Sequence, residues 1–163
     1  METINAPYVL RAGEERSHPG MFPTIKADSA DTGGAMTAIE GVLAPWASGP
    51  PLHAHSHEDE CLYVIDGSVL VQIGGEVHTL ERGAFAWMPR GVPHTFANAG
   101  PTTARMFGVT LPGGIEEMFA VQGAYLASVD GLPDLAEVAR LCAPWGSVLG
   151  PPIRAASAPA RLS

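Results

Sequence analysis

Residues 51–60 read Pro51-Leu52-His53-Ala54-His55-Ser56-His57-Glu58-Asp59-Glu60 and hold three of the six histidines of the chain beside three acidic residues. Successive side chains of a strand point to opposite faces, so His53 and His55 can aim two ring nitrogens at one point. Glu60 follows a short turn, at the start of the next expected antiparallel strand, from which it can supply a carboxylate oxygen to the same point. This stretch predicts a metal site built on strands.

A further metal ligand is available from His94, which follows a loop framed by Pro89 and Pro93. Proline cannot donate a hydrogen bond within a central ladder, so the chain should re-enter a sheet at His94. Three imidazoles and one carboxylate suit a divalent transition metal, namely Fe, Mn, Co, Ni, Cu or Zn, and the sequence leaves its identity open. The expected metal ligands are His53, His55, Glu60 and His94.

His57 continues the alternation and is an alternative ligand in place of His53. That choice would leave only two residues between the second histidine and Glu60, which makes a cramped turn. We therefore expect His57 to lie in the loop, or to hydrogen-bond a ligand rather than bind the metal. His18 and His78 have no ligand-type partner nearby in the sequence and are expected on the surface.

Short β-type runs separated by turn residues extend from about residue 22 to residue 110 and predict an all-β fold. Asp66-Gly67 and Gly74-Gly75 are two-residue turn signals, so residues 61–80 should form a meander of three strands. The chain holds 19 glycines and 15 prolines, which disfavours a bundle of long helices. The expected strands are Phe22–Ala27, Ala35–Leu43, Pro51–His55, Cys61–Ile65, Ser68–Ile73, Glu76–Leu80, Ala84–Met88, His94–Ala97 and Thr103–Val109.

The pattern becomes helical after residue 114. Ile115, Met118, Phe119 and Gln122 follow a 3–4 spacing, which predicts a short helix able to cover the mouth of a barrel. A second helix is expected over Pro133–Cys142. We divide the single domain into an N-terminal arm with strands (1–34), a barrel core (35–112), C-terminal helices that pack on the barrel (113–150) and a flexible tail (151–163).

The two histidine-bearing segments resemble the two motifs of the cupin family. The first motif, G-x5-H-x-H-x3–4-E-x6-G, is matched at His53, His55, Glu60 and Gly67. Its opening glycine is replaced by Ala47. The second motif, G-x5-P-x-G-x2-H-x3-N, is matched at Gly83, Pro89, Gly91, His94 and Asn98. The resemblance covers about residues 35–112 and implies a double-stranded β-helix, or jelly-roll barrel, with a metal inside.

The segment Gly108–Phe119 and the later Leu149-Gly150-Pro151-Pro152 are similar to the single-domain cupins called quercetinase-like. That resemblance implies a metal-dependent dioxygenase that acts on an aromatic or enolisable small molecule, with Glu60 accepting the substrate proton. A non-redox isomerase, cyclase or lyase would use the same ligands and the same base. A non-catalytic cupin that binds a small molecule is the alternative from another class of function.

Alternation along the strands also predicts the substrate pocket. Two residues share the face of Glu60 and two share the face of His94, and we expect these residues to bind the substrate. They are Leu62, Val64, Phe96 and Asn98. Such a pocket has few polar anchors, so it suits a hydrophobic or aromatic small molecule, with O2 as a candidate second substrate.

Composition excludes several classes of partner. Acidic residues outnumber basic ones by 17 to 9 without a Lys or Arg cluster, so we expect no nucleic-acid partner. No apolar stretch approaches the roughly 20 residues that cross a bilayer, and no secretory signal pattern is visible. Cys61 and Cys142 lack a disulfide-type or metal-type spacing. We therefore expect a cytoplasmic protein with free thiols and no membrane partner.

A small jelly roll leaves sheet edges and an outer apolar face uncovered. We therefore expect a homodimer, in which an N-terminal segment such as Tyr8–Leu10 adds to the sheet of the partner. Cys61 and Tyr63 point away from the face of Glu60, and we expect them to serve packing or a dimer contact rather than catalysis.

Overall fold

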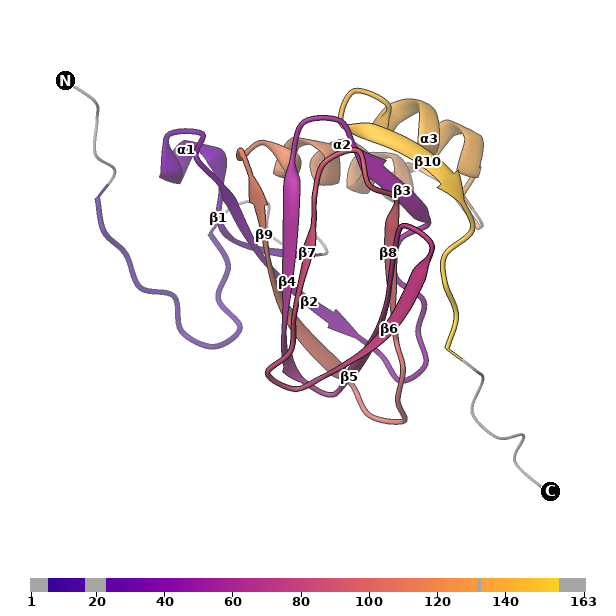
Figure 1. Cartoon of the computed structure of the whole chain (residues 1–163). Helices are drawn as coiled ribbons and strands as arrows, with labels where there is room; N and C mark the ends of the chain where they lie inside the picture. Colours follow the sequence, from indigo (N-terminus) through magenta and orange to yellow (C-terminus); the bar gives the residue numbers. More distant parts are fainter. Residues whose placement is uncertain (1–5, 17–22, 132, 156–163) are drawn as a thin grey trace.

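Two five-stranded antiparallel sheets form the walls of a barrel, and helices cover one of its ends (Figure 1). The computed structural model describes residues 6–16, 23–131 and 133–155. The first sheet has the order β1 (Thr24–Ala27), β2 (Thr37–Leu43), β9 (Ala104–Leu111), β4 (Asp59–Asp66) and β7 (Phe85–Met88). The second has the order β10 (Gly146–Gly150), β3 (Leu52–His55), β8 (His94–Asn98), β5 (Ser68–Ile73) and β6 (Glu76–Glu81). The helices are α1 (Ser29–Thr32), α2 (Ile115–Ser128) and α3 (Leu135–Cys142).

This architecture confirms the predicted all-β class and the double-stranded β-helix. Each expected strand is present with its ends shifted by no more than two residues. Phe22, the first residue of the first expected strand, lies outside the described residues, as does His18. Gly67 has φ of 80°, and a Cβ there would lie 2.8 Å from the Cα of Ala104, so the turn between β4 and β5 requires glycine.

Two elements were not expected from the sequence. β10 lies within residues 113–150, which we assigned to helices, and it pairs antiparallel with β3. Its side chains show no alternation of polarity, because it is an edge strand whose middle residues are exposed. α1 is a single turn, in which the Asp28 side chain accepts a hydrogen bond from the Asp31 backbone. Of the predicted tail, residues 156–163 lie outside the described residues.

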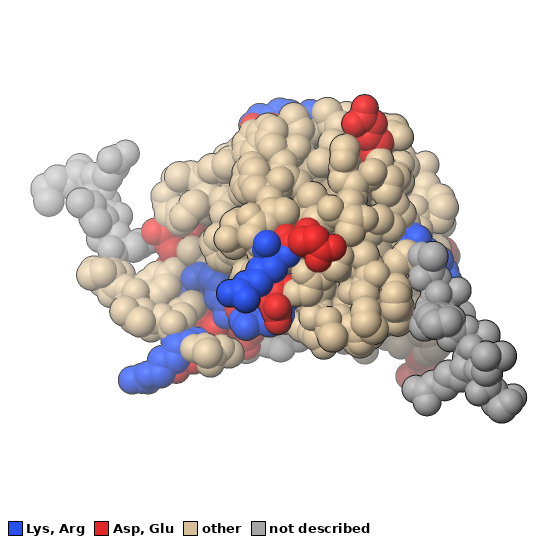
Figure 2. Space-filling model, turned by 60° about the horizontal axis from the view of Figure 1, so that its bottom comes forward, with Lys and Arg blue, Asp and Glu red and all other residues tan. Residues whose placement is uncertain are grey.

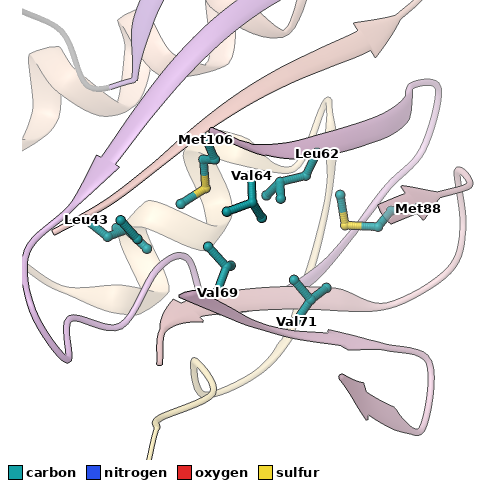
Figure 3. Packing of buried hydrophobic residues seen from close by; sticks show 8 residues of the cluster. Leu43, Leu62, Val64, Val69, Val71, Met88 and Met106 are labelled. Atoms are coloured by element: carbon teal, nitrogen blue, oxygen red, sulfur yellow. The ribbon is translucent and has the colours of Figure 1, made fainter. Parts of the chain in front are cut away.

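The apolar core lies between the two sheets (Figure 3). Along β4 the burial alternates, so that Leu62 and Val64 point inward while Tyr63 points outward. Val64 packs with Val69 and Val71 of the second sheet, and all three are fully buried. The turn between β4 and β5 lies at the end of the barrel away from α2 and α3 (Figure 1), so this part of the core closes that end.

Most of the basic side chains that the structure describes on the outer surface form ion pairs. Glu40 of β2 lies 3.0 Å from the Lys26 ammonium and also accepts a 2.5 Å hydrogen bond from Arg105. The Arg105 hydrogen bond contributes most to holding the pKa of Glu40 below its usual range. On the face shown in Figure 2, basic side chains lie beside acidic ones and uncharged residues cover most of the rest. No helix in the described ranges is long and apolar enough to cross a membrane.

Glu116 ties α2 to the N-terminal part of the domain. It is almost fully buried in the first turn of α2 and accepts hydrogen bonds from Ser29, Thr37 and Gly114. Burial alone would raise the pKa of Glu116, but these hydrogen bonds outweigh that effect and lower the pKa. The carboxylate therefore stabilises the folded state as an anion.

We predict that Glu116→Gln lowers the free energy of unfolding by about 1–3 kcal/mol near neutral pH, because an amide group cannot accept all of these hydrogen bonds. The contribution of Glu116 is full above the ordinary glutamate pKa of about 4.3 and is lost as the pH falls through the lower folded-state pKa. Urea unfolding between about pH 3 and pH 7 measures both effects. The neighbouring Glu117 is exposed, and Glu117→Gln is the matched control. An equal loss of stability in both variants would contradict the role of Glu116.

Candidate metal centre

Three histidines from the second sheet meet inside the barrel. His53 and His55 lie on β3, and His94 begins β8 directly opposite His53 in the register of the sheet. The ring centroids of these histidines are 4.4–5.3 Å apart. The strand alternation of β3 and the proline-framed loop before β8 thus bring the three imidazoles together, as the sequence predicts.

Glu60 reaches this cluster from the first sheet. Its Oε2 atom lies 3.1 Å from Nε2 of His55 and 3.3 Å from Nε2 of His94. One ligand atom from each of the four residues lies within 4.8 Å of the others. Glu60, His55 and His94 are buried, and His53 is partly buried. The four predicted ligands therefore form one candidate metal-binding cluster.

Backbone carbonyls orient two of the three imidazoles. Nδ1 of His53 lies 2.8 Å from the carbonyl oxygen of Pro51, and Nδ1 of His94 lies 2.9 Å from that of Val92. When each Nδ1–H donates to its carbonyl, the Nε2 lone pair remains available to a metal. Imidazole nitrogens and a carboxylate oxygen are common ligands of divalent transition metals, so the donor set fits such an ion.

The protonation states of His53 and Glu60 also fit a metal site, whereas His94 shares a proton with Glu60 when no metal is bound. Burial lowers the pKa of His53 to about 4, and the neighbouring His94 acts in the same direction, so the imidazole of His53 is neutral at pH 7. Burial favours the uncharged form of Glu60, but hydrogen bonds from His55 and His94 outweigh it and hold the pKa of Glu60 far below its usual range. Burial lowers the pKa of His94, whereas the hydrogen bond to Glu60 raises it and prevails.

The remaining histidines lie apart from the cluster in the described part of the chain. His57 is exposed in the turn between β3 and β4, where we expected it. His78 is exposed on β6, with its Nε2 atom 3.4 Å from Glu76. His57 is therefore a suitable control for experiments on the cluster.

A largely apolar cavity of about 340 Å³ adjoins the candidate metal centre. His53, His55 and Glu60 form part of its wall. Leu62 and Phe96, two of the residues expected to bind the substrate, also line it. The volume is at the lower end of the range of small-molecule sites.

Two residues expected in the pocket lie elsewhere. Val64 shares the face of Glu60 but is fully buried in the core, one pleat beyond Leu62. The amide of Asn98 donates to the carbonyls of Leu43, Ala44 and Thr102, and its oxygen accepts from the backbone of Gly100. Neither side chain lines the cavity, because strand alternation fixes the face of a residue but not its depth in the barrel. Asn98 instead holds the loops at its end of the barrel.

Helix α2 covers the cavity with one face. Ile115, Met118, Phe119 and Gln122 line the cavity and follow the spacing from which the sequence predicts this helix. Residues 146–148 of β10 and Cys142 of α3 line it as well. The sequence did not indicate these, because their position depends on the pairing of β10 with β3. Cys142 and Cys61 are both free cysteines, as expected.

Residues 40–110 match the family described as Cupin domain. This segment contains both histidine-bearing motifs and the four residues of the candidate metal centre. The chain therefore carries a cupin domain, and the resemblance inferred from the motifs is confirmed.

The chain is 33% identical over 121 residues to "Quercetin 2,3-dioxygenase" of Bacillus subtilis, a match that covers 72% of this chain and 35% of that relative. It is 39% identical over 75 residues to "Tetracenomycin polyketide synthase protein TcmJ" of Streptomyces glaucescens, covering 46% of this chain and 48% of the relative. The chain thus spans about a third and about half of the length of these curated relatives.

Among solved structures, a protein with a double-stranded β-helix domain from Klebsiella pneumoniae matches with a TM-score of 0.51 at 22% identity. The match covers 61% of this chain and 84% of that chain. At this identity the match shows the fold alone.

We predict that His94→Ala loses most of the bound metal, because it removes the one ligand of the cluster that a distant segment supplies. Metal analysis of protein purified without added metal measures the content, and a cooperative thermal transition checks the fold. His57→Ala is the control and should keep the metal. Full occupancy in the His94 variant, or loss of metal in the His57 variant, would show that the ligands are assigned incorrectly.

Proposed function

We propose that the protein is a metal-dependent enzyme of the dioxygenase type that acts on an aromatic or enolisable small molecule. The observation that carries this proposal is the position of Glu60 at the boundary between the three histidines and the apolar cavity. Its Oε2 atom contacts two imidazoles, while its Oε1 atom has no hydrogen-bond partner among the described residues. Oε1 is thus available to a ligand in the cavity.

The lining of the cavity favours a flat apolar ligand. Leu62, Phe96, Met106, Met118 and Phe119 contribute aliphatic and aromatic surface. A sugar or sugar phosphate would need several polar partners, whereas an aromatic compound needs them only at the oxygen that meets the metal centre. The cavity therefore supports the aromatic or enolisable class.

Glu60 is suited to take a proton from the hydroxyl of such a substrate. A bound divalent metal would supply Lewis acidity at a substrate oxygen and, if it is redox-active, reactivity toward O2. Oε1 of Glu60 would accept the hydroxyl proton of the substrate, which leaves an enolate or phenolate in the cavity. The backbone carbonyls of Pro51 and Val92 keep two imidazoles oriented while the proton moves. α2 forms one wall of the cavity.

The names of two relatives agree with this substrate class, since one is called a quercetin dioxygenase and the other a polyketide synthase protein. Each is longer than the region that this chain matches, so the substrate and the use of O2 are proposals here. Location in the cytoplasm and the absence of a nucleic-acid partner stay predictions.

We predict that Glu60→Gln keeps the metal but lowers the rate by at least about a hundredfold, the usual effect of removing a positioned general base. The amide keeps the size and one oxygen of the side chain but not its basicity. An oxygen electrode with quercetin and 1,3-diketones as substrates measures the rate, and the exposed Glu117→Gln is the control. Near-normal turnover by the Glu60→Gln variant would show that Glu60 serves only as a ligand.

The same measurement of O2 uptake and substrate conversion distinguishes the dioxygenase from the alternative functions. Substrate conversion without O2 uptake would replace the dioxygenase by an isomerase, cyclase or lyase. Stabilisation of the protein by a ligand that is not converted would indicate a binding protein.

We propose that a second copy of the chain packs on an aromatic face of the first sheet. Tyr63 of β4 lies between Phe85 of β7 and Phe107 of β9 in the register, with Trp87 alongside, and these side chains are 37–57% exposed. A half-exposed aromatic side chain can bury roughly 100 Å² of accessible surface in a contact. Two copies related by a twofold axis would therefore bury much of the surface area that a stable dimer needs. β7 is also a sheet edge.

The N-terminal segment makes contacts within its own chain instead. The Tyr8 hydroxyl donates to the carbonyl of Lys26, and the Arg16 guanidinium lies 4.5 Å from the centre of the Tyr8 ring. A partner contact through Tyr8–Leu10 would have to replace these interactions, so we favour the aromatic face.

We predict that Phe85→Asp converts a dimer into a monomer, because it places a charge on the most exposed aromatic residue of the proposed contact. Light scattering coupled to size-exclusion chromatography measures the mass. Leu135→Asp, at an exposed position of α3 outside this face, is the control and should stay dimeric. A wild-type mass of one chain at all concentrations would refute the dimer.

A further inference from the structure

Thr110 lies in a row of inward-facing residues that crosses the first sheet. In the register of that sheet, Glu60 of β4 stands opposite Met88 of β7 on one side and Thr110 of β9 on the other. Thr110 in turn stands opposite Thr37 of β2. Opposite residues on one face have Cβ atoms about 4.5–5.5 Å apart. Thr110 is therefore an immediate neighbour of the carboxylate in the candidate metal centre.

The hydroxyl of Thr110 has no hydrogen-bond partner among the described residues. The residue is only 1% exposed, yet it lines the cavity. Thr37, its neighbour in the row, differs in this respect, because its hydroxyl donates to Glu116 and accepts from the backbone of Gly114. Buried polar groups in native proteins are almost always hydrogen-bonded, and a lone one needs a ligand or a water molecule as its partner.

We propose that the hydroxyl of Thr110 binds an oxygen of the molecule that occupies the cavity, next to the oxygen that meets the metal centre. This inference rests on the proposed function of the site. No hydrogen bond of the protein is lost when the Thr110 side chain turns about its Cα–Cβ bond, so the hydroxyl is free to follow the ligand. Thr110 thereby anchors and selects the substrate, while Glu60 takes the proton.

A hydrogen bond to Thr110 would narrow the class of substrates that the site accepts. The ligand carries two oxygens on adjacent or next-adjacent carbons of an otherwise apolar aromatic framework, as in an α-hydroxyketone or an enolised 1,3-dicarbonyl compound. One oxygen meets the metal centre and Glu60, and the other meets Thr110. A ligand with a single oxygen would leave the Thr110 hydroxyl unpaired, and such a mismatch lowers affinity.

Two variants distinguish the effect of the Thr110 hydroxyl group from the effect of the shape of its side chain. Thr110→Val keeps the shape and removes the hydroxyl, and Thr110→Ser keeps the hydroxyl. The probes are 3-hydroxyflavone, which has a hydroxyl beside a carbonyl, and 2-naphthol, which has one oxygen. Equilibrium binding to protein loaded with Zn(II), which has no redox chemistry and so leaves the probes unconsumed, is followed by the absorbance of the probe.

We predict that Thr110→Val weakens the binding of 3-hydroxyflavone about tenfold, the effect of one hydrogen bond, and that of 2-naphthol by less than about twofold. Thr110→Ser should stay within about threefold of wild type for both probes. Zinc content should be equal in all three proteins. The metal-free Thr110→Val variant should melt no lower than wild type, because the hydroxyl has no partner among the described residues.

The other outcomes overturn either the role of Thr110 or the proposed substrate class. Unchanged binding of 3-hydroxyflavone by the Thr110→Val variant, or equal weakening of both probes, overturns the role of Thr110 and leaves the proposed function standing. A lower melting temperature of the metal-free Thr110→Val variant shows a partner within the protein and also overturns it. If zinc-loaded wild type binds neither probe, the proposed substrate class fails and the inference fails with it.

Discussion

The contact between the Glu60 carboxylate and the imidazoles of His55 and His94 is the interaction on which the site depends. It joins the two sheets across the barrel, since Glu60 comes from β4 and the histidines from β3 and β8. An anion buried in an apolar barrel is costly unless it is paired and hydrogen-bonded. The imidazoles provide that compensation, and a bound cation would do so more strongly. The same carboxylate is thus held ionised and held at the wall of the cavity.

Strand alternation divides the barrel between this site and the core. Glu60, Leu62 and Val64 follow one another on the inner face of β4, and they pass from the metal centre through the cavity wall into the packed core. The centre is therefore placed on rigid strands whose far ends are fixed by close packing. Ligand residues held in this way need little rearrangement to meet a metal, which favours tight and geometrically selective binding.

Strand periodicity explains which features the sequence predicts and which it does not. The i, i+2 spacing of His53 and His55 depends on local strand geometry and is visible in the sequence. His94 joins them through the pairing of β3 with β8, and the match to the second motif indicated it in the sequence. How far along the barrel a residue lies depends on the register between distant strands. Strand alternation therefore predicts that Asn98 points inward, but not that it lies away from the cavity. β10 depends on pairing with β3, although Gly146, whose Cβ would collide with the carbonyl of Ala54, marks a close approach of two backbones.

One part of the cavity wall lies beyond the segment that defines the family. The cupin match ends at residue 110, whereas α2, α3 and β10 supply one wall of the cavity. Two sets of contacts attach this cover, formed by α2, α3 and β10, to the rest of the domain. Glu116 of α2 accepts hydrogen bonds from Ser29 and Thr37, and β10 pairs with β3, the strand that carries His53 and His55. In this chain α2 adds Met118 and Phe119 to the apolar surface that the barrel supplies, whereas the polar groups of the metal centre come from the barrel itself.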